Sequence, residues 1–236
     1  MQHAPVHEVG LGLSDRAAWS RAFGYACLVF AALLMTGCST LTRSSFDQVR
    51  LAIADRRAHA VSADQVAALR YAQIAVEGME RPVVMVLGNV DDGRQAWYSG
   101  DRRIVFLRNG LLTGTAGMPG GDAAGITVDN PAVFDDLREV GDGTRVQRSY
   151  DWMPGYRYGV QVRGDMRRGP MVQVEILGQN RTLLRIDERL SGPGVDALNN
   201  YYVDPQDGAI VKSRQLVRPG KSLEFTVLKP YREGGQ

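Results

Sequence analysis

The stretch that decides the fold reads PVVMVLGNVDDGRQAWYSGDRRIVFLRNGLLTGT and covers residues 82–115. It alternates short β-branched and aromatic runs with turn residues, a pattern typical of strands joined by tight connections. The pair Asn109-Gly110 tolerates positive φ at both positions and therefore favours a hairpin turn. This stretch predicts antiparallel strands that follow one another directly.

The same pattern continues toward the C-terminus. Because no helix of useful length interrupts it, the sequence does not predict alternating βαβ units. The Gly-rich segment 114–130 lacks periodicity and is predicted to be a surface loop. We expect a mainly β fold, either an antiparallel β-sandwich or a curved barrel-like sheet. The further candidate strands lie at 144–152, 156–164, 170–177, 182–190, 200–204, 209–217 and 222–229.

Two N-terminal helices are predicted to pack on this sheet. Ser45 begins a capping-box pattern, in which a Gln follows three residues later, and the helix it opens should run to about Arg57. Ser62 repeats the pattern before a second helix, which Gly78 can end. The second helix is apolar on most of its circumference, which favours core packing over a partner-binding surface.

Composition limits the function classes. The formal net charge is +2 and no long basic tract occurs, so nucleic acid is not an expected partner. The two cysteines, Cys27 and Cys38, lie in one apolar N-terminal stretch, and His59 is the one histidine in the part expected to fold. A disulfide scaffold and a thiolate metal site are therefore excluded. A histidine-rich metal site or a Ser-His-Asp triad has almost no residues from which to form. We expect no metal and no cofactor.

The N-terminus has the anatomy of a signal peptide. Residues 22–36 form an uncharged apolar run that follows Arg21 and ends in small residues. A membrane-spanning helix, the less favoured alternative, needs about 20 apolar residues. The tetrapeptide Met35-Thr36-Gly37-Cys38 resembles the bacterial lipobox, with Met in place of the commoner Leu. We predict cleavage between Gly37 and Cys38 and attachment of diacylglyceryl and N-acyl groups to Cys38; an ordinary signal peptide that happens to contain a cysteine is the alternative.

These features predict three segments: a signal peptide at 1–37, a lipidated tether at 38–44, and a single periplasmic domain at 45–236. The two or three acyl chains of a lipoprotein anchor firmly, because each buried CH₂ contributes about 0.8 kcal/mol. Ser39 follows the cysteine where an Asp would favour inner-membrane retention. We therefore expect lipid anchoring at the periplasmic face of the outer membrane.

Acidic pairs and aromatic residues are the candidate chemical groups of the mature chain. Neighbouring acids such as Asp187-Glu188 point to opposite faces of a strand, whereas a glycosidase needs two facing carboxyls, so no catalytic residues are predicted. The run from Asp204 to Gly208 has the composition of a turn and lacks the ligands of a calcium loop. Aromatic side chains that are exposed together can stack on sugar rings, although strand aromatics more often fill cores. The candidates for contact with polysaccharide or a protein partner are Trp97, Tyr156, Tyr158, Tyr201 and Tyr202.

Segments 68–117 and 199–231 resemble the YjbF/GfcB family of exopolysaccharide and group 4 capsule lipoproteins, while the middle of the chain, from 116 to about 172, matches loosely. The resemblance implies a periplasmic accessory lipoprotein that works with an outer-membrane barrel protein and a second periplasmic protein, and it implies no catalytic residues. It rests on the order of Trp97, Asn109-Gly110, Asn200 with Tyr201 and Tyr202, Asp204 before Gly208, Lys212-Ser213 with Gln215, and Lys229-Pro230.

We therefore expect a non-enzymatic accessory or assembly factor in exopolysaccharide or capsule export. One alternative is a polysaccharide-modifying enzyme, which requires carboxylate, Tyr or Arg groups that converge in an exposed cleft. The other is a periplasmic lipid or lipoprotein carrier, which requires an apolar cavity inside a half-open sheet.

Overall fold

The structure is a computed structural model and describes residues 61–232. The predicted signal peptide, the Cys38 tether and the predicted helix at 45–57 lie outside the described residues. Within 61–232, no helix is long and apolar enough to pass through a bilayer. The helical elements there are α3 (Ala63–Ala68) and the short 3-10 turns η1 (Pro131–Phe134) and η2 (Leu137–Glu139).

Twelve antiparallel strands form one sheet, which confirms the predicted mainly β class. The strands are β1 (Gln73–Glu77), β2 (Val83–Asp91), β3 (Arg94–Tyr98), β4 (Ile104–Arg108), β5 (Leu111–Ala116), β6 (Asp122–Val128), β7 (Arg145–Met153), β8 (Arg157–Ile176), β9 (Gln179–Gly192), β10 (Val195–Val203), β11 (Ile210–Arg218) and β12 (Lys221–Lys229).

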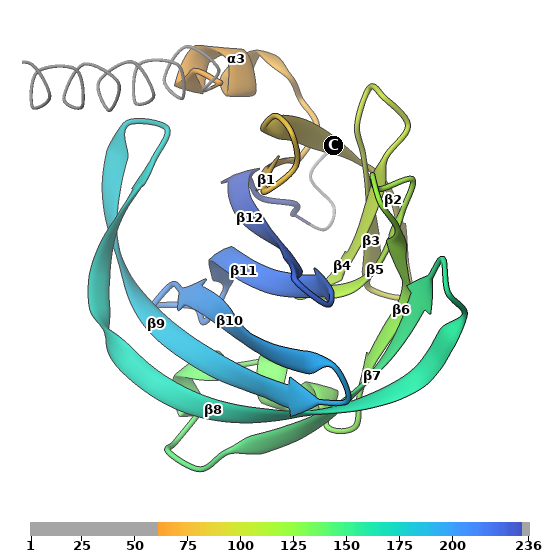
Figure 1. Ribbon diagram of the computed structural model, residues 1–236. Helices are drawn as coiled ribbons and strands as arrows, with labels where there is room; N and C mark the ends of the chain where they lie inside the picture. The colour runs from red at the N-terminus through yellow and green to blue at the C-terminus, as the bar shows by residue number, and fades with distance from the viewer. Residues whose placement is uncertain (1–60, 233–236) are drawn as a thin grey trace, which may run out of the picture. The chain divides into compact units, whose positions relative to one another are not determined.

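The sheet is nearly closed on itself, so the curved barrel-like arrangement holds rather than the sandwich (Figure 1). Its order is β5-β4-β3-β2-β1-β12-β11-β10-β9-β8-β7-β6, and β1 beside β12 is its one pairing between strands far apart in sequence. The strands at the two ends, β5 and β6, are consecutive in the chain. Side chains connect them: the Thr115 hydroxyl donates to Asp122 Oδ1 at 2.9 Å and accepts from the Ala123 amide at 3.0 Å.

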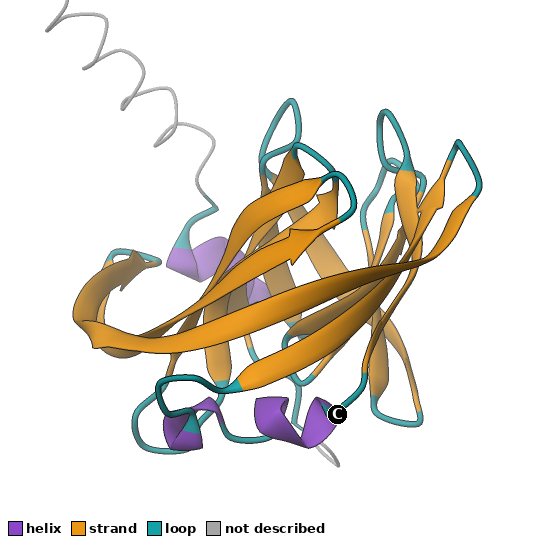
Figure 2. Cartoon of the chain, turned by 60° about the horizontal axis from the view of Figure 1, so that its bottom comes forward, coloured by secondary structure: helices purple, strands orange, loops and turns teal. Residues whose placement is uncertain are grey.

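The interior of the sheet holds the core. Alternating strand positions supply the main apolar cluster, which includes Ile74, Trp97, Trp152 and Phe225. A second cluster lies under the 3-10 turns, where Phe134 and other apolar residues of this segment pack on β7, β9 and β10. Figure 2 shows the short helical turns at one end of the sheet. They cover apolar strand surface that would otherwise face water.

The predicted second helix is only partly correct. Its capping box is present, since the Ser62 hydroxyl accepts from the Gln65 amide at 3.2 Å and the Gln65 side chain accepts from the Ser62 amide at 2.9 Å. The helix ends at Ala68, however, and Gln73–Glu77 forms strand β1 instead of continuing to Gly78. Because β1 pairs with both β2 and β12 and buries Ile74 completely, sheet pairing outweighs local helix propensity.

Two connections were also predicted wrongly. Segment 114–130 contains strand β6, which its small residues and glycines concealed; Ala123 is nevertheless fully buried and faces the core. Strand β8 runs unbroken from Arg157 to Ile176, where two strands were predicted. Pro170 is tolerated because the register shifts between Arg168 and Met171, which is where a bulge leaves a residue unpaired.

Candidate functional site

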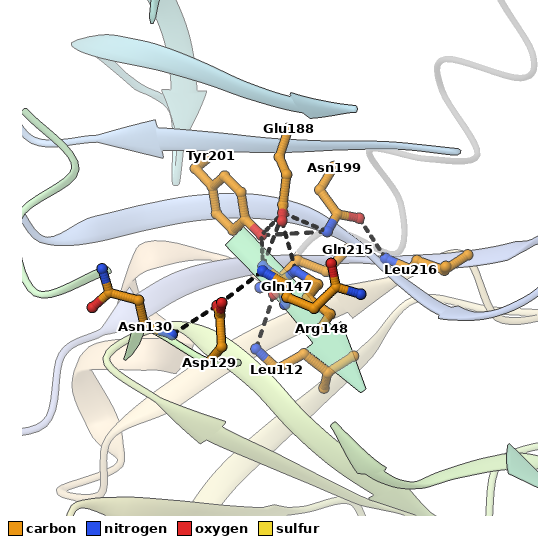
Figure 3. A network of polar contacts seen from close by, with 10 residues as sticks. All are labelled: Leu112, Asp129, Asn130, Gln147, Arg148, Glu188, Asn199, Tyr201, Gln215 and Leu216. Atoms are coloured by element: carbon orange, nitrogen blue, oxygen red, sulfur yellow. Dashed lines mark hydrogen bonds and ion pairs between the residues drawn. The ribbon is translucent and has the colours of Figure 1, made fainter. Parts of the chain in front are cut away.

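Arg148 and Glu188 form a buried ion pair (Figure 3). Arg148 of β7 contacts Glu188 of β9 through two hydrogen bonds, from Nε to Oε1 at 2.6 Å and from Nη2 to Oε2 at 2.9 Å. Two residues of β10 complete it: the Tyr201 hydroxyl donates to Glu188 Oε2 at 2.7 Å, and the Asn199 amide donates to the same oxygen at 3.0 Å. The side chains of Arg148 and Glu188 are 1% and 0% exposed, so the pair is closed to solvent.

Electrostatics keep the Arg148 guanidinium charged despite its burial. Burial by itself would lower the pKa of the Arg148 guanidinium, but the adjacent Glu188 carboxylate raises that pKa above its ordinary value. Burial raises the pKa of Tyr201 well above its usual range and that of Tyr150 to about 12, so both phenols remain protonated donors at neutral pH. A buried charge is tolerated where its partners satisfy it, and here the carboxylate accepts from three side chains.

Further polar bonds connect β11 to strands that are not its neighbours in the sheet. Gln215 accepts from the Leu112 amide of β5 at 2.9 Å and donates to the Gly110 carbonyl at 2.8 Å. The Trp152 indole of β7 donates to the Val217 carbonyl at 2.7 Å. These bonds cross the interior, so they fix the curvature of the sheet as well as its register.

A cavity of about 570 Å³ adjoins this network. Phe134 joins the two, since it lines the cavity, lies 5.1 Å from the Arg148 guanidinium and meets the Tyr201 ring edge-on at 5.7 Å. The apolar lining of the cavity comes from β1, β3, β4, β8, β11 and β12, and Ile74 and Trp97 of this lining are buried. The polar lining residues that are exposed, and therefore lie at the mouth, include Asp135, Gln179 and Asp207. The cavity is of the size of small-molecule sites, which span roughly 300–1,000 Å³.

The structure separates the five predicted contact residues. Trp97 is 2% exposed and Tyr201 is fully buried, so the prediction that these two lie on a contact surface is wrong; both fill the interior of the sheet. Tyr202 is half-buried against a small apolar cluster. Tyr156 and Tyr158, by contrast, are 72% and 59% exposed, with ring centroids 6.4 Å apart beside the β7–β8 turn. Their contact with polysaccharide or a partner stays a prediction.

The acidic residues behave largely as their spacing indicates. Glu188 points inward, while its neighbour Asp187 lies on the other face and pairs with Arg185 at 2.7 Å. The run from Asp204 to Gly208 is a turn closed by a 3.0 Å backbone hydrogen bond. Residues 61–232 contain no group of three or more His, Cys, Asp or Glu side chains placed to hold a metal ion.

Sequence reasoning did not find the Arg148–Glu188 pair. The period-two alternation of the strands could have revealed it. Arg148 lies between Val146 and Tyr150, at a position that faces inward. Glu188 lies between Ile186 and Leu190, at an inward position of its own strand. Two charges of opposite sign at inward positions of separate strands favour a buried pair.

The comparisons with known proteins connect this architecture to a family. The family model described as "Group 4 capsule polysaccharide lipoprotein gfcB, YjbF" matches residues 46–228, which is more than half of the chain. The chain belongs to this family. The resemblance of segments 68–117 and 199–231 is thereby confirmed.

One curated protein is similar to this chain in sequence, and one solved structure is similar to it in fold. A protein of Escherichia coli (strain K12) named "Uncharacterized lipoprotein GfcB" is 24% identical over 204 residues, which cover 84% of this chain and 95% of that protein. A crystal structure of the hypothetical lipoprotein YmcC from Escherichia coli (K12) superposes with a TM-score of 0.65 at 24% identity, covering 79% of this chain and 96% of the other. The nearly closed sheet is therefore the fold of this relative too.

Proposed function

We propose that this YjbF/GfcB-family protein is an accessory factor in the export of capsule or exopolysaccharide. The observation that carries the proposal is the family match over residues 46–228, because its description combines group 4 capsule polysaccharide with a lipoprotein. In this proposal Cys38 carries the lipid, the protein sits at the periplasmic face of the outer membrane, and an outer-membrane barrel protein and a second periplasmic protein are its partners.

The arrangement of polar groups supports a binding or assembly role over polysaccharide modification. Arg148, Glu188 and Tyr201 do converge, as a lyase or hydrolase would require, but all three are buried and bonded to one another. A polymer chain cannot reach them without opening the core. Their contacts instead stabilise the curved sheet that presents the outer surface to partners.

Deleting the gene tests the proposal against the enzyme alternative. An export factor is needed for transport, so its loss should leave polymer of unchanged composition inside the cell and deplete it outside. Polymer is measured separately inside the cell and outside it. In each fraction we compare its amount, its monosaccharide composition and its substituents. Polymer that reaches the surface in normal amount but with altered length or substitution would contradict the proposal and support the enzyme.

The two exposed tyrosines are the surface that we expect to contact polymer or a protein partner. Flat, rigid aromatic side chains dominate interfaces, and losing a hot spot worth about 2 kcal/mol weakens binding roughly 30-fold. Replacing both Tyr156 and Tyr158 with Ala should therefore lower exported polymer several-fold. The measurement is surface polymer in the deletion strain that carries the variant.

Tyr98 provides the matched control for this variant, because it is a third exposed tyrosine and lies on β3, at 40% exposure. Tyr98→Ala should restore export as well as the wild type does, at equal protein abundance. Full export by the double variant would contradict the prediction that Tyr156 and Tyr158 contact polymer or a partner.

A further inference from the structure

The 570 Å³ cavity is built as a binding site with an apolar interior and a polar mouth. Figure 1 shows the long β8–β9 hairpin curving so that its turn reaches toward α3. The end of this hairpin contributes Ile176, Leu177 and Gln179 to the lining, together with residues of β3, β4 and β12. Strands from distant parts of the chain therefore enclose one space.

The inner lining suits a hydrocarbon chain. Apolar side chains supply it from six strands, so an acyl chain there would exchange water for carbon contacts. They include Ile74, Trp97, Leu107 and Val227 of the main core cluster, and Val211 and Leu228 of the small cluster that also contains Ile176 and Leu177.

The lining also offers one free hydrogen-bond donor. Trp97 is buried, and its indole Nε1 has no hydrogen-bond partner among the described residues. The other buried core tryptophan, Trp152, does have a partner, the Val217 carbonyl. Leaving a buried N–H unpaired costs free energy, which an oxygen atom of a bound molecule would recover. The chemistry therefore calls for a ligand that brings an acceptor oxygen as well as hydrocarbon.

The charges at the mouth select the head group. Asp135, Asp204 and Asp207 stand there against one cation, Arg181, which leaves a net charge of −2. The Arg181 guanidinium already pairs with Asp204 at 2.6 Å and is not free for an anionic ligand. A carboxylate or phosphate head would meet more acidic than basic side chains in this lining, whereas hydroxyl and ester groups can bond to Gln179, which also lines the cavity. The Asn109 amide already donates to Asp135 at 3.0 Å.

We propose that this cavity binds a single acyl chain that carries an uncharged, oxygen-bearing head such as a glycerol ester. The proposal does not depend on the role in polysaccharide export. The same chemistry has two sources, a free lipid and the ester-linked acyl chain that we expect on Cys38 of the protein itself, and the experiment distinguishes them.

Quenching of Trp97 fluorescence tests the proposal. A chain that starts at Ser39 keeps all of the described residues 61–232, with the three apolar clusters, and lacks Cys38. Trp152→Phe makes Trp97 the sole tryptophan of this chain. Monoacylglycerol brominated in mid-chain, added below its micellar concentration, should quench it saturably, while the brominated fatty acid at pH 8 should bind at least about tenfold more weakly.

Two variants test whether the quencher binds inside the cavity. In the Trp97→Phe chain the fluorescence comes from Trp152, which does not line the cavity, so little saturable quenching is expected. Val227→Phe should fill the cavity and abolish quenching of Trp97, with Val84→Phe on the other side of the sheet as the matched control. Unfolding curves confirm that each variant is folded. No saturable quenching of Trp97, or equal quenching in Val227→Phe and Val84→Phe, would overturn the proposal.

The same quenching measurement on the lipidated protein identifies the source of the acyl chain. That protein is extracted from membranes and kept in solution by an amphipathic synthetic polymer without added lipid. If added brominated monoacylglycerol quenches Trp97 there as it does in the anchorless chain, a free lipid is the ligand. If the lipidated protein resists quenching and the anchorless chain does not, the acyl chain of Cys38 already occupies the cavity. Both results support an acyl site, whereas absence of quenching in both proteins contradicts it.

Discussion

Replacing Glu188 with Gln is expected to lower the free energy of unfolding by about 3–5 kcal/mol, because it leaves the Arg148 charge buried without a counter-charge. The substitution preserves shape, but the amide NH₂ replaces one acceptor oxygen with a donor that faces the donors of Arg148, Asn199 and Tyr201. The loss therefore reports on the missing charge and acceptor rather than on packing. Urea unfolding followed by fluorescence measures it. Since domains have a total stability of about 5–15 kcal/mol, this loss is a large share of the total.

Two further variants distinguish the effect of the buried charge pair from the effect of losing any charged side chain. Arg189 and Asp196 form an exposed pair at 2.9 Å, with 67% and 75% of the two side chains accessible. Asp196→Asn should therefore cost less than about 1 kcal/mol. Removing both buried charges, as Arg148→Met with Glu188→Leu, should recover most of the stability lost in Glu188→Gln. A Glu188→Gln protein as stable as Asp196→Asn would contradict this account of the core.

Gly164→Ala is expected to destabilise the protein by about 1–3 kcal/mol through overpacking against the same carboxylate. A Cβ at Gly164 would lie 2.3 Å from Glu188 Oε1 and 2.9 Å from a methyl group of Val146. The carboxylate cannot swing away freely, because Arg148 holds that oxygen at 2.6 Å. The loss is measured by the same urea unfolding.

Coupling to Glu188 identifies the cause of this loss. In a Glu188→Ala background the clashing oxygen is gone, so adding Gly164→Ala should cost much less than it does in the wild type. Gly141 provides the matched control, since a Cβ there meets no atom within 4 Å and Gly141→Ala should leave stability almost unchanged. If Gly164→Ala lowers the free energy of unfolding equally in both backgrounds, the contact with Glu188 is not the cause of the loss.

Much of the fold could be predicted from local pattern. The Asn109-Gly110 turn and the alternating runs of 82–115 correspond to real strands and hairpins, because turn chemistry and period-two alternation act over a few residues. The sequence did not reveal strand β1, because its residues also suit a helix and the choice is made by β12, which lies far along the chain. Pairing between the first and last strands is a long-range property that no local window contains.

The site was predicted less well than the fold. Composition does not say which side of a strand faces the interior, so the sequence did not separate the buried aromatic residues Trp97 and Tyr201 from the exposed Tyr156 and Tyr158. The buried pair of Arg148 and Glu188 was visible as two charges at inward positions, yet their meeting depends on the order of β7 and β9 in the sheet. The cavity could not be predicted, since turns distant in sequence form it.

The central claim is that a lipid-anchored protein of this family supports polysaccharide export, and complementation with a Cys38→Ala variant tests it most directly. Surface polymer is measured in a deletion strain that carries either the wild type or the variant, with palmitate labelling of both proteins. The account predicts that the wild type is labelled and restores surface polymer, while Cys38→Ala accumulates folded, unlabelled and unable to restore it. An unlabelled wild type, or full export by Cys38→Ala, would contradict the account.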